Sequence, residues 1–182
     1  MKQVYLETPR LVLKTLTPSA SSKVLEFYIN NKDFLEEYEP ERLPYFYTKQ
    51  HQKQLLRWDL DGLHHLALVR VWIFKKEDLL TPIGTIALSN ITRGVFQSCF
   101  LGYKIDKANK QQGYMTEGLS RMIDYAFSDL KLHRIEANIM PQNTASINLV
   151  KKIGFKEEGL ARKYLQINGK WEDHIHMVLL NE

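Results

Sequence analysis

The stretch from Leu101 to Thr116 has residue types that can bind a phosphate group. A strand pattern ending at Ile105 leads through Lys110-Gln111-Gln112-Gly113 into a helical pattern. The first N–H groups of a helix lack intrahelical partners and lie at the positive end of the helix dipole, so they attract anions. A glycine also lets the main chain approach a bulky anion closely. A glycine that only forms a turn gives the same pattern, so this stretch alone leaves both interpretations open.

A second segment, Asn143 to Phe155, joins an asparagine to a helical pattern that ends at a glycine. Its sequence is Asn-Thr-Ala-Ser-Ile-Asn-Leu-Val-Lys-Lys-Ile-Gly-Phe. Asparagine is a favoured N-cap and glycine a favoured C-cap, so an ordinary capped helix gives this pattern too.

Both segments resemble the acetyl-CoA signatures of the GNAT superfamily of N-acetyltransferases. The first signature has Gln or Arg three residues before a glycine, and Gly or Ala two residues after it. Here these positions are Lys110, Gly113 and Met115, so Met115 departs from the small residue while Lys110 keeps a positive charge. Phosphate binding by backbone donors does not depend on that side chain.

The second signature, N-x-x-A/S-(x)7-G-F, is matched by Asn143, Ser146 and Gly154-Phe155. In the family its asparagine bonds the pantetheine. The resemblance therefore implies acetyl-CoA as co-substrate. The cofactor-binding residues that it implies are Tyr103, Lys104, Ile105, Lys110, Gln111, Gln112, Gly113, Tyr114, Met115, Thr116, Asn143 and Ser146.

Within this superfamily the chain is similar to the RimJ/RimL-type ribosomal-protein-alanine/serine N-acetyltransferases, most of all to the RimJ type. The resemblance covers nearly the whole chain and thins between Phe34 and Phe74, where we expect the acceptor to bind. The motifs that carry it are Leu6 to Leu11, Cys99 to Tyr103, His133-Arg134-Ile135, Met140 to Asn143, Gly154 to Gly159 and Trp171 to His174.

Amide formation needs a neutral amine, a polarised thioester carbonyl and a proton for the leaving thiolate. In one branch of the family, a glutamate base and a tyrosine acid stand where this chain has Asn138 and Val150. Ser146 lies one helical turn before Val150, and the Rim-type resemblance implies that it is the general acid; a serine that only bonds the helix backbone is the alternative. The base is unknown. Glu136 would share a strand face with Asn138, but an exposed surface acid is the ordinary interpretation, and Tyr103 would ordinarily serve packing.

Hydrophobic periodicity predicts the order β-α-α-β-β-β-α-β-α-β-β. The resemblance implies a mixed α/β GNAT fold, a single domain over residues 1–182 with a splayed sheet of about seven strands flanked by about four helices. Thr17 and Thr48 are the expected caps of the first two helices. The expected strands are 10–16, 66–74, 83–91, 99–105, 133–140, 155–167 and 171–180, and the helices are 17–31, 48–62, 115–130 and 144–153.

The composition indicates an ordinary globular protein, and we expect it in the cytoplasm as a monomer or homodimer. Hydrophobic residues make up 44% and charged residues 25% of 182 residues, no apolar run is long enough for a membrane span, and residues 1–7 lack the apolar core that a signal peptide would need. The single cysteine, Cys99, excludes an internal disulfide framework, and its strand setting is not that of a nucleophile. The six histidines show no metal-binding spacing, and His174 and His176, which alternate on a strand, are expected to pack or lie at the surface.

The acceptor stays open between several classes. A protein α-amino group with a pKa near 7.7–8.0 is partly neutral at pH 7, so a site without an evident base favours a ribosomal protein N-terminus over a polyamine or aminoglycoside. Glutamates between Phe34 and Tyr47 would attract a basic peptide. A non-catalytic acyl-CoA-binding regulator is a further alternative. The net charge of +4 also suits a nucleic-acid-binding module, but the lysines are dispersed and no such motif is present.

Overall fold

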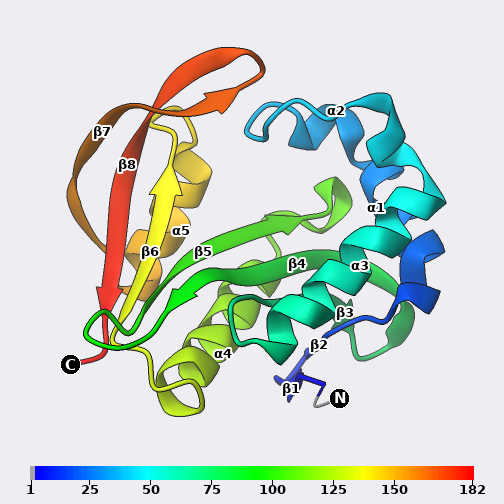
Figure 1. Ribbon diagram of the computed structural model, residues 1–182, viewed down its shortest axis with the longest axis horizontal. Coiled ribbons are helices and arrows are strands. Elements are labelled where there is room, and N and C mark those ends of the chain that lie inside the picture. Colours follow the sequence, from blue (N-terminus) through cyan, green and yellow to red (C-terminus); the bar gives the residue numbers. More distant parts are fainter. Residues whose placement is uncertain (1–2) are drawn as a thin grey trace.

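One mixed sheet organises residues 3–182, the part of the chain that the computed structural model describes (Figure 1). The strand order is β1-β2-β3-β4-β5-β6-β8-β7, and every neighbouring pair is antiparallel except β5 and β6. The strands are β1 (Tyr5–Glu7), β2 (Leu11–Lys14), β3 (Val69–Lys75), β4 (Asp78–Thr92), β5 (Ser98–Ile105), β6 (Arg134–Ile139), β7 (Lys156–Ile167) and β8 (Lys170–Leu180). The helices are α1 (Ser21–Asn30), α2 (Lys32–Leu35), α3 (Lys49–His64), α4 (Tyr114–Ser128) and α5 (Thr144–Ile153), with short 3-10 turns at Pro18–Ala20, Pro44–Tyr47 and Lys107–Asn109.

Alternation along the strands separates two apolar layers. In β3, Val71 and Ile73 join the larger core, which α4 and α5 cover, while Trp72 and Phe74 join a second cluster under α1 and α3. Successive strand residues point to opposite faces, so one strand supplies both layers. Burying each large apolar side chain stabilises the fold by about 1.5–3 kcal/mol relative to exposure. The sheet is thereby held rigid between two helical layers.

The sheet is splayed between β5 and β6, as the resemblance implied. These strands pair in parallel only from Ser98 to Phe100 and from Arg134 to Glu136, and then diverge. Residues 101–105 of β5 and 137–139 of β6 therefore do not pair with each other. Figure 1 shows the two halves of the sheet opening away from this point.

The mixed α/β fold is confirmed, but the sheet is larger than expected. The described residues form eight strands rather than seven, because the three-residue strand β1 pairs with β2 at the sheet edge. They form five α-helices rather than four, because the one-turn helix α2 begins directly after α1. Elements this short carry too few residues to show a hydrophobic period.

Two local predictions were wrong. Thr17 was expected to cap the first helix, but its hydroxyl lies 2.6 Å from that of Ser19 and a 3-10 turn intervenes before α1. Pro82 falls between the strands expected at 66–74 and 83–91, yet it belongs to β4, which begins at Asp78. Pro82 lies opposite Phe74, where the register shifts, and such an irregularity accommodates a residue that has no N–H to donate. Thr48 does cap α3, with its Oγ1 accepting from the N–H of His51 at 3.2 Å.

Candidate active site

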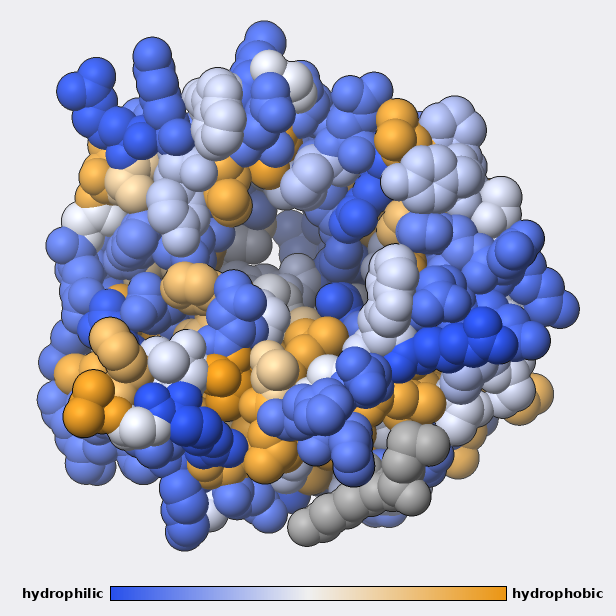
Figure 2. Space-filling view, viewed as in Figure 1, coloured by the Kyte–Doolittle hydropathy of each residue, from blue (hydrophilic) through white to orange (hydrophobic). Residues whose placement is uncertain are grey.

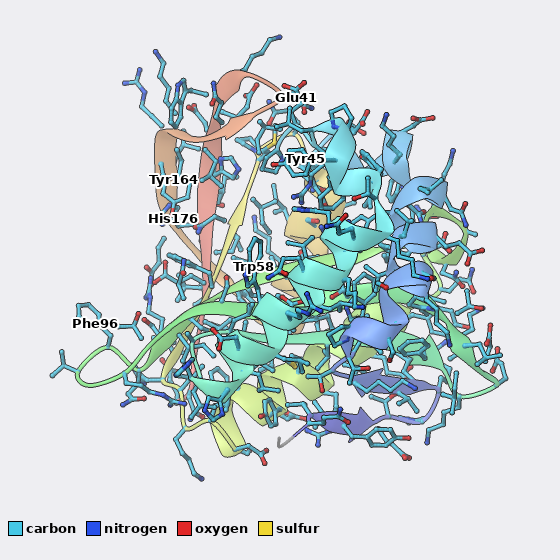
Figure 3. All side chains as sticks on the ribbon, turned by 45° about the vertical axis from the view of Figure 1, so that its right-hand side comes forward. Glu41, Tyr45, Trp58, Phe96, Tyr164 and His176 are labelled. Atoms are coloured by element: carbon cyan, nitrogen blue, oxygen red, sulfur yellow. The ribbon has the colours of Figure 1, made fainter. Side chains whose placement is uncertain are left out.

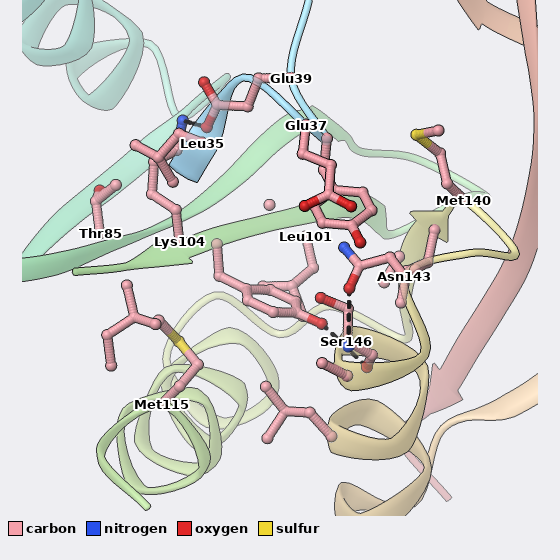
Figure 4. Close-up of a pocket in the computed structure, with 18 of the residues that line it drawn as sticks. Leu35, Glu37, Glu39, Thr85, Leu101, Lys104, Met115, Met140, Asn143 and Ser146 are labelled. Atoms are coloured by element: carbon pink, nitrogen blue, oxygen red, sulfur yellow. Dashed lines mark hydrogen bonds and ion pairs between the residues drawn. The ribbon is translucent and has the colours of Figure 1, made fainter. Parts of the chain in front are cut away.

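A cavity of about 700 Å³ occupies the space where β5 and β6 diverge. The start of α4 lines one end of the cavity, and residues 34–42 line the other end. The start of α5 lines the wall between them, next to the end of β6. Figure 2 shows a hollow near the middle of this face, and Figure 4 shows the side chains that line it. The two sequence segments that suggested a common ligand thus meet at one cavity.

The α4 end of the cavity offers backbone N–H groups. Gly113 caps α4 in the left-handed conformation, with φ +80°, and Gln111 also has a positive φ of 59°. Within residues 3–182, the N–H groups of residues 111–116 have no acceptor. A Cβ added to Gly113 would meet only the Nη2 atom of Arg10, at 3.3 Å. Free donors at the start of a 15-residue helix, with open space before them, fit a pyrophosphate.

Two neighbouring side chains clarify the departures from the family pattern. Met115 is buried in the core with α4, so it does not crowd the exposed Gly113 backbone. The Lys110 ammonium lies 4.5 Å from the ring centroid of Phe34 and remains at the cavity rim. Both arrangements leave the backbone donors of the loop open.

Arg10 holds this loop from the other end of the chain. Its Nη1 donates to the Gln112 carbonyl at 3.0 Å, its Nε donates to a carboxylate oxygen of Glu117 at 2.7 Å, and its guanidinium lies 4.5 Å from the Tyr114 ring centroid. Thr8 donates its hydroxyl to the other Glu117 oxygen at 2.6 Å. The Thr8–Arg10–Glu117 cluster therefore fixes the first turn of α4 and the loop before it.

Glu117 should contribute stability only where its carboxylate is charged. Burial alone would raise the pKa of Glu117, but hydrogen bonds from Thr8 and Arg10 lower it below its ordinary value. A lowered folded-state pKa contributes stability above the unfolded value, near 4.3, that is lost as the pH falls through the folded value. We expect Glu117→Gln to lower the melting temperature by about 3 °C at pH 7, and the difference from wild type to close below about pH 4. Melting curves between pH 7 and pH 3 measure it, and a difference that is constant with pH would contradict this role.

Asn143, Ser146 and Tyr103 meet at the start of α5 (Figure 4). Asn143 Oδ1 accepts from the Ser146 N–H at 3.1 Å, and Figure 4 shows the amide nitrogen of Asn143 on the side toward Glu37. Tyr103 donates its hydroxyl to the Ser146 carbonyl at 3.3 Å. Burial raises the pKa of Tyr103 to about 12, so its phenol stays protonated at neutral pH. Asn143 thus caps the helix with its oxygen and keeps two N–H donors for a ligand.

The structure changes the interpretation of the acidic segment and of Lys104. Lys104 was predicted to bind the cofactor, but its side chain forms an ion pair with Glu39, which also accepts from Arg42 at 3.0 Å. Burial alone would raise the pKa of Glu39, but Lys104 and Arg42 lower it, so the carboxylate is charged and neutralised. Glu39 is therefore not free to attract a peptide, whereas Glu37 is exposed and lines the cavity.

Three side chains near β6, those of Glu136, Asn138 and Cys99, are not placed or protonated to act as the general base. Glu136 was expected to be exposed, but it is half-buried and accepts from Arg134 Nε at 2.7 Å. Asn138 lines the cavity and donates to the Tyr164 hydroxyl at 3.4 Å. Cys99 is buried, which raises the pKa of its thiol to about 12 and keeps it protonated.

Two contributors were not found from the sequence. The Thr8–Arg10–Glu117 cluster gave no local signal, because Arg10 and Glu117 lie 107 positions apart. His174 was expected to pack or lie at the surface; it does pack, since it is buried against Tyr164, but it also lines the cavity, which the sequence did not indicate. Residues 3–182 hold no group of three His, Cys, Asp or Glu side chains placed to bind a metal ion. None of the helices in this described part has the length and apolar character of a membrane-spanning segment.

Comparisons with known proteins agree with this geometry. The family described as "Acetyltransferase (GNAT) domain" matches residues 10–156. A probable N-acetyltransferase, YjcK of Bacillus subtilis, is 37% identical over 97% of both chains. The [ribosomal protein uS5]-alanine N-acetyltransferase of Escherichia coli is 33% identical over 95% of this chain and 89% of its own. The crystal structure of the ribosomal-protein-S5-alanine acetyltransferase of Vibrio fischeri has a TM-score of 0.93 and 32% identity, covering 98% of this chain and 97% of that one. The chain is therefore a member of the GNAT acetyltransferase family, related to the ribosomal-protein-alanine N-acetyltransferases.

Proposed function

We propose that this protein transfers the acetyl group of acetyl-CoA to the N-terminal amine of a ribosomal protein that begins with alanine or serine, in the cytoplasm. One observation carries the proposal: the N–H groups before α4, the Asn143 amide and the exposed Glu37 carboxylate all border one continuous cavity. A thioester substrate with a phosphate-rich tail and a cationic acceptor can therefore enter from opposite ends. The uS5-alanine enzymes among the relatives support the choice of acceptor.

The two ends of the cavity divide the binding of the substrates. The pyrophosphate is assigned to the N–H groups of residues 111–116, where several donors and the helix dipole favour an anion. The acyl-carrying arm is assigned to the gap between β5 and β6, with Asn143 Nδ2 as a donor. The protonated amine is assigned to the end near Glu37, because an exposed carboxylate attracts a cation.

Departure of the thiolate needs a proton, and Ser146 is the assigned donor. Ser146 lines the cavity, and its side chain lies within hydrogen-bonding reach of the Tyr103 hydroxyl, where it opposes the larger effect of burial on the pKa of Tyr103. The backbone of Ser146 holds the start of the helix, since its N–H serves the Asn143 cap and its carbonyl accepts from Tyr103. Replacing the side chain should therefore leave the helix start intact.

Ser146→Ala should lower kcat by about ten- to a hundredfold, toward the low end for general acid catalysis, with the Kd for acetyl-CoA nearly unchanged. Asn148→Ala, at an exposed position of α5 that does not line the cavity, is the matched control and should keep wild-type activity. Thiol release and calorimetric titration with acetyl-CoA separate the two effects. A fully active Ser146→Ala variant would leave Ser146 as an ordinary residue of the first helical turn.

The proposed function itself is tested by binding and turnover together. Acetyl-CoA binds the native state, so millimolar concentrations should raise the melting temperature by mass action. Free thiol should then be released with a peptide carrying an N-terminal alanine or serine. Binding without turnover of any amine would favour a regulator, and turnover only of polyamines or aminoglycosides would favour the small-amine alternative.

A further inference from the structure

The acceptor side of the cavity contains a buried histidine that no step above uses. His174, on β8, is 3% exposed, and it borders the same cavity as Asn138 and Ser146. Residues 135, 137 and 139 of β6 point into the core under α4 and α5. Asn138 pairs with His176 in the ladder, so Asn138, His174 and His176 share the opposite face.

The hydrogen bond at one ring nitrogen of His174 decides the state of the other. Nδ1 lies 3.0 Å from the backbone carbonyl oxygen of Glu172. A carbonyl can only accept, so Nδ1 carries the proton and Nε2 of the neutral ring has a free lone pair. Nε2 makes no hydrogen bond within residues 3–182. It is also not one of the fully buried side-chain atoms there that lack a partner, so part of it can be reached from the cavity. A small exposed part of the ring with an unprotonated nitrogen is what a proton acceptor requires.

Tyr164 holds this histidine in place. Its ring centroid lies 5.7 Å from that of His174 and 5.1 Å from that of His176, and its hydroxyl accepts from Asn138 Nδ2. Figure 3 shows Tyr164 and His176 side by side on the β7–β8 part of the sheet. Asn138 Oδ1 and His176 Nε2 are buried without partners in the described residues, so this face has spare hydrogen-bonding capacity beside the cavity.

We propose that His174 is the general base of the acetyl transfer, an inference that rests on the proposed function. Nε2 takes one proton from the acceptor ammonium, directly or through one water molecule, and so leaves a neutral amine. The amine lone pair forms the C–N bond at the thioester carbonyl carbon. As the C–S bond breaks, the second nitrogen-bound proton reaches the sulfur by way of the Ser146 hydroxyl. The products are the amide and the thiol, and His174 returns its proton to solvent.

Charged and titratable groups surround the His174 end of the cavity on several elements. Tyr164 faces the ring from β7, and His176, which Glu158 influences, lies two residues along β8. The same cavity is also lined by Glu37, Tyr38, Glu39, Arg42, Arg70, Tyr103 and Lys104. No carboxylate within residues 3–182 is hydrogen-bonded to the ring. The acid–base chemistry at this end of the cavity is therefore assigned to the imidazole.

The experiment compares His174→Asn with wild type, using acetyl-CoA and a peptide with an N-terminal alanine. Asparagine can keep a donor toward the Glu172 carbonyl but has no group that accepts a proton at neutral pH. We expect kcat at pH 7 to fall by about ten- to a hundredfold, with the Kd for acetyl-CoA within about twofold of wild type. His133→Gln, an exposed histidine away from the cavity, is the matched control and should keep wild-type activity.

The pH dependence separates a base from a packing residue. A peptide α-amine with a pKa near 8 is about 10% neutral at pH 7 and about 90% neutral at pH 9. The loss in His174→Asn should therefore shrink to within about threefold at pH 9, because the acceptor then needs no base. A loss that is equal at pH 7 and pH 9, or a fully active variant, would overturn the assignment.

If His174→Asn does not fold, the pH dependence of wild-type kcat tests the assignment. With a base, kcat should fall less than about threefold from pH 9 to pH 7. Without a base, kcat follows the neutral fraction of the amine and falls about tenfold. If the wild type binds acetyl-CoA but acetylates no peptide, the proposed function fails, and this inference fails with it. Wild-type turnover with undiminished variants would overturn only the role of His174.

Discussion

Gly113→Val should raise the KM for acetyl-CoA by about a hundredfold and lower the melting temperature by only a few degrees. The left-handed backbone at Gly113 presents the loop amides to the cavity, and a β-branched residue at φ +80° is strained. Losing one or two charge-assisted hydrogen bonds to a phosphate removes about 3 kcal/mol of binding, which is about a hundredfold in affinity. The fold suffers less, because the new Cβ meets only the flexible end of Arg10.

A second glycine separates backbone strain from ligand binding. Gly94, in the turn between β4 and β5, has φ +70°, and a Cβ added there meets nothing within 4 Å. Gly94→Val therefore carries a similar backbone cost outside the cavity, so it should lower the melting temperature like Gly113→Val and leave the KM for acetyl-CoA unchanged. Steady-state kinetics and melting curves of both variants decide. Equal effects of the two variants on KM would reduce Gly113 to a turn residue.

The long elements of this fold could be predicted because their periods are strong. Helix α4 places Met115, Leu119, Met122 and Ala126 on one buried face, as the three-and-four spacing indicated. The β7–β8 hairpin turns at Asn168-Gly169, and both residues have the positive φ that a tight two-residue turn requires. Strand β1 and helix α2 escaped prediction because packing and pairing, rather than a local pattern, determine elements of three or four residues.

Site residues, too, could be predicted only where their role depends on local sequence. Gly113 and Asn143 could be found because each stands at a helix start, where backbone chemistry is local. The pairing of Lys104 with Glu39 could not, because the two residues are brought together by the segment after α2, which shows no regular period. His174 also escaped, because its role depends on the carbonyl and the cavity around its ring. Which face of a strand borders a cavity is a property of the whole sheet.

The largest expected effect is the difference in kcat/KM between two kinds of acceptor amine. At pH 7 we expect kcat/KM for a peptide with an N-terminal alanine or serine to exceed that for spermidine by about two-hundredfold. This ratio follows from the difference in acidity between ammonium groups with pKa values near 8 and 10.4, because the amine must lose a proton, to His174 or to water, before it attacks. Asn138 cannot deprotonate a strongly basic amine as a carboxylate at that position would. The exposed Glu37 carboxylate attracts either cation, so it does not by itself discriminate.

The ratio of the two kcat/KM values should also change with pH. Between pH 7 and pH 9 turnover of the peptide, which His174 can deprotonate, should change less than about threefold, while the neutral fraction of spermidine rises about a hundredfold. The preference for the peptide should therefore narrow by about tenfold or more at pH 9, measured by thiol release at one fixed acetyl-CoA concentration. The same peptide with a blocked N-terminus is the control and should give no turnover. Faster acetylation of spermidine at pH 7 would reject the N-terminal acceptor and select the small-amine function. The site would then deprotonate the more basic amine efficiently, which a site built for a peptide N-terminus does not need to do.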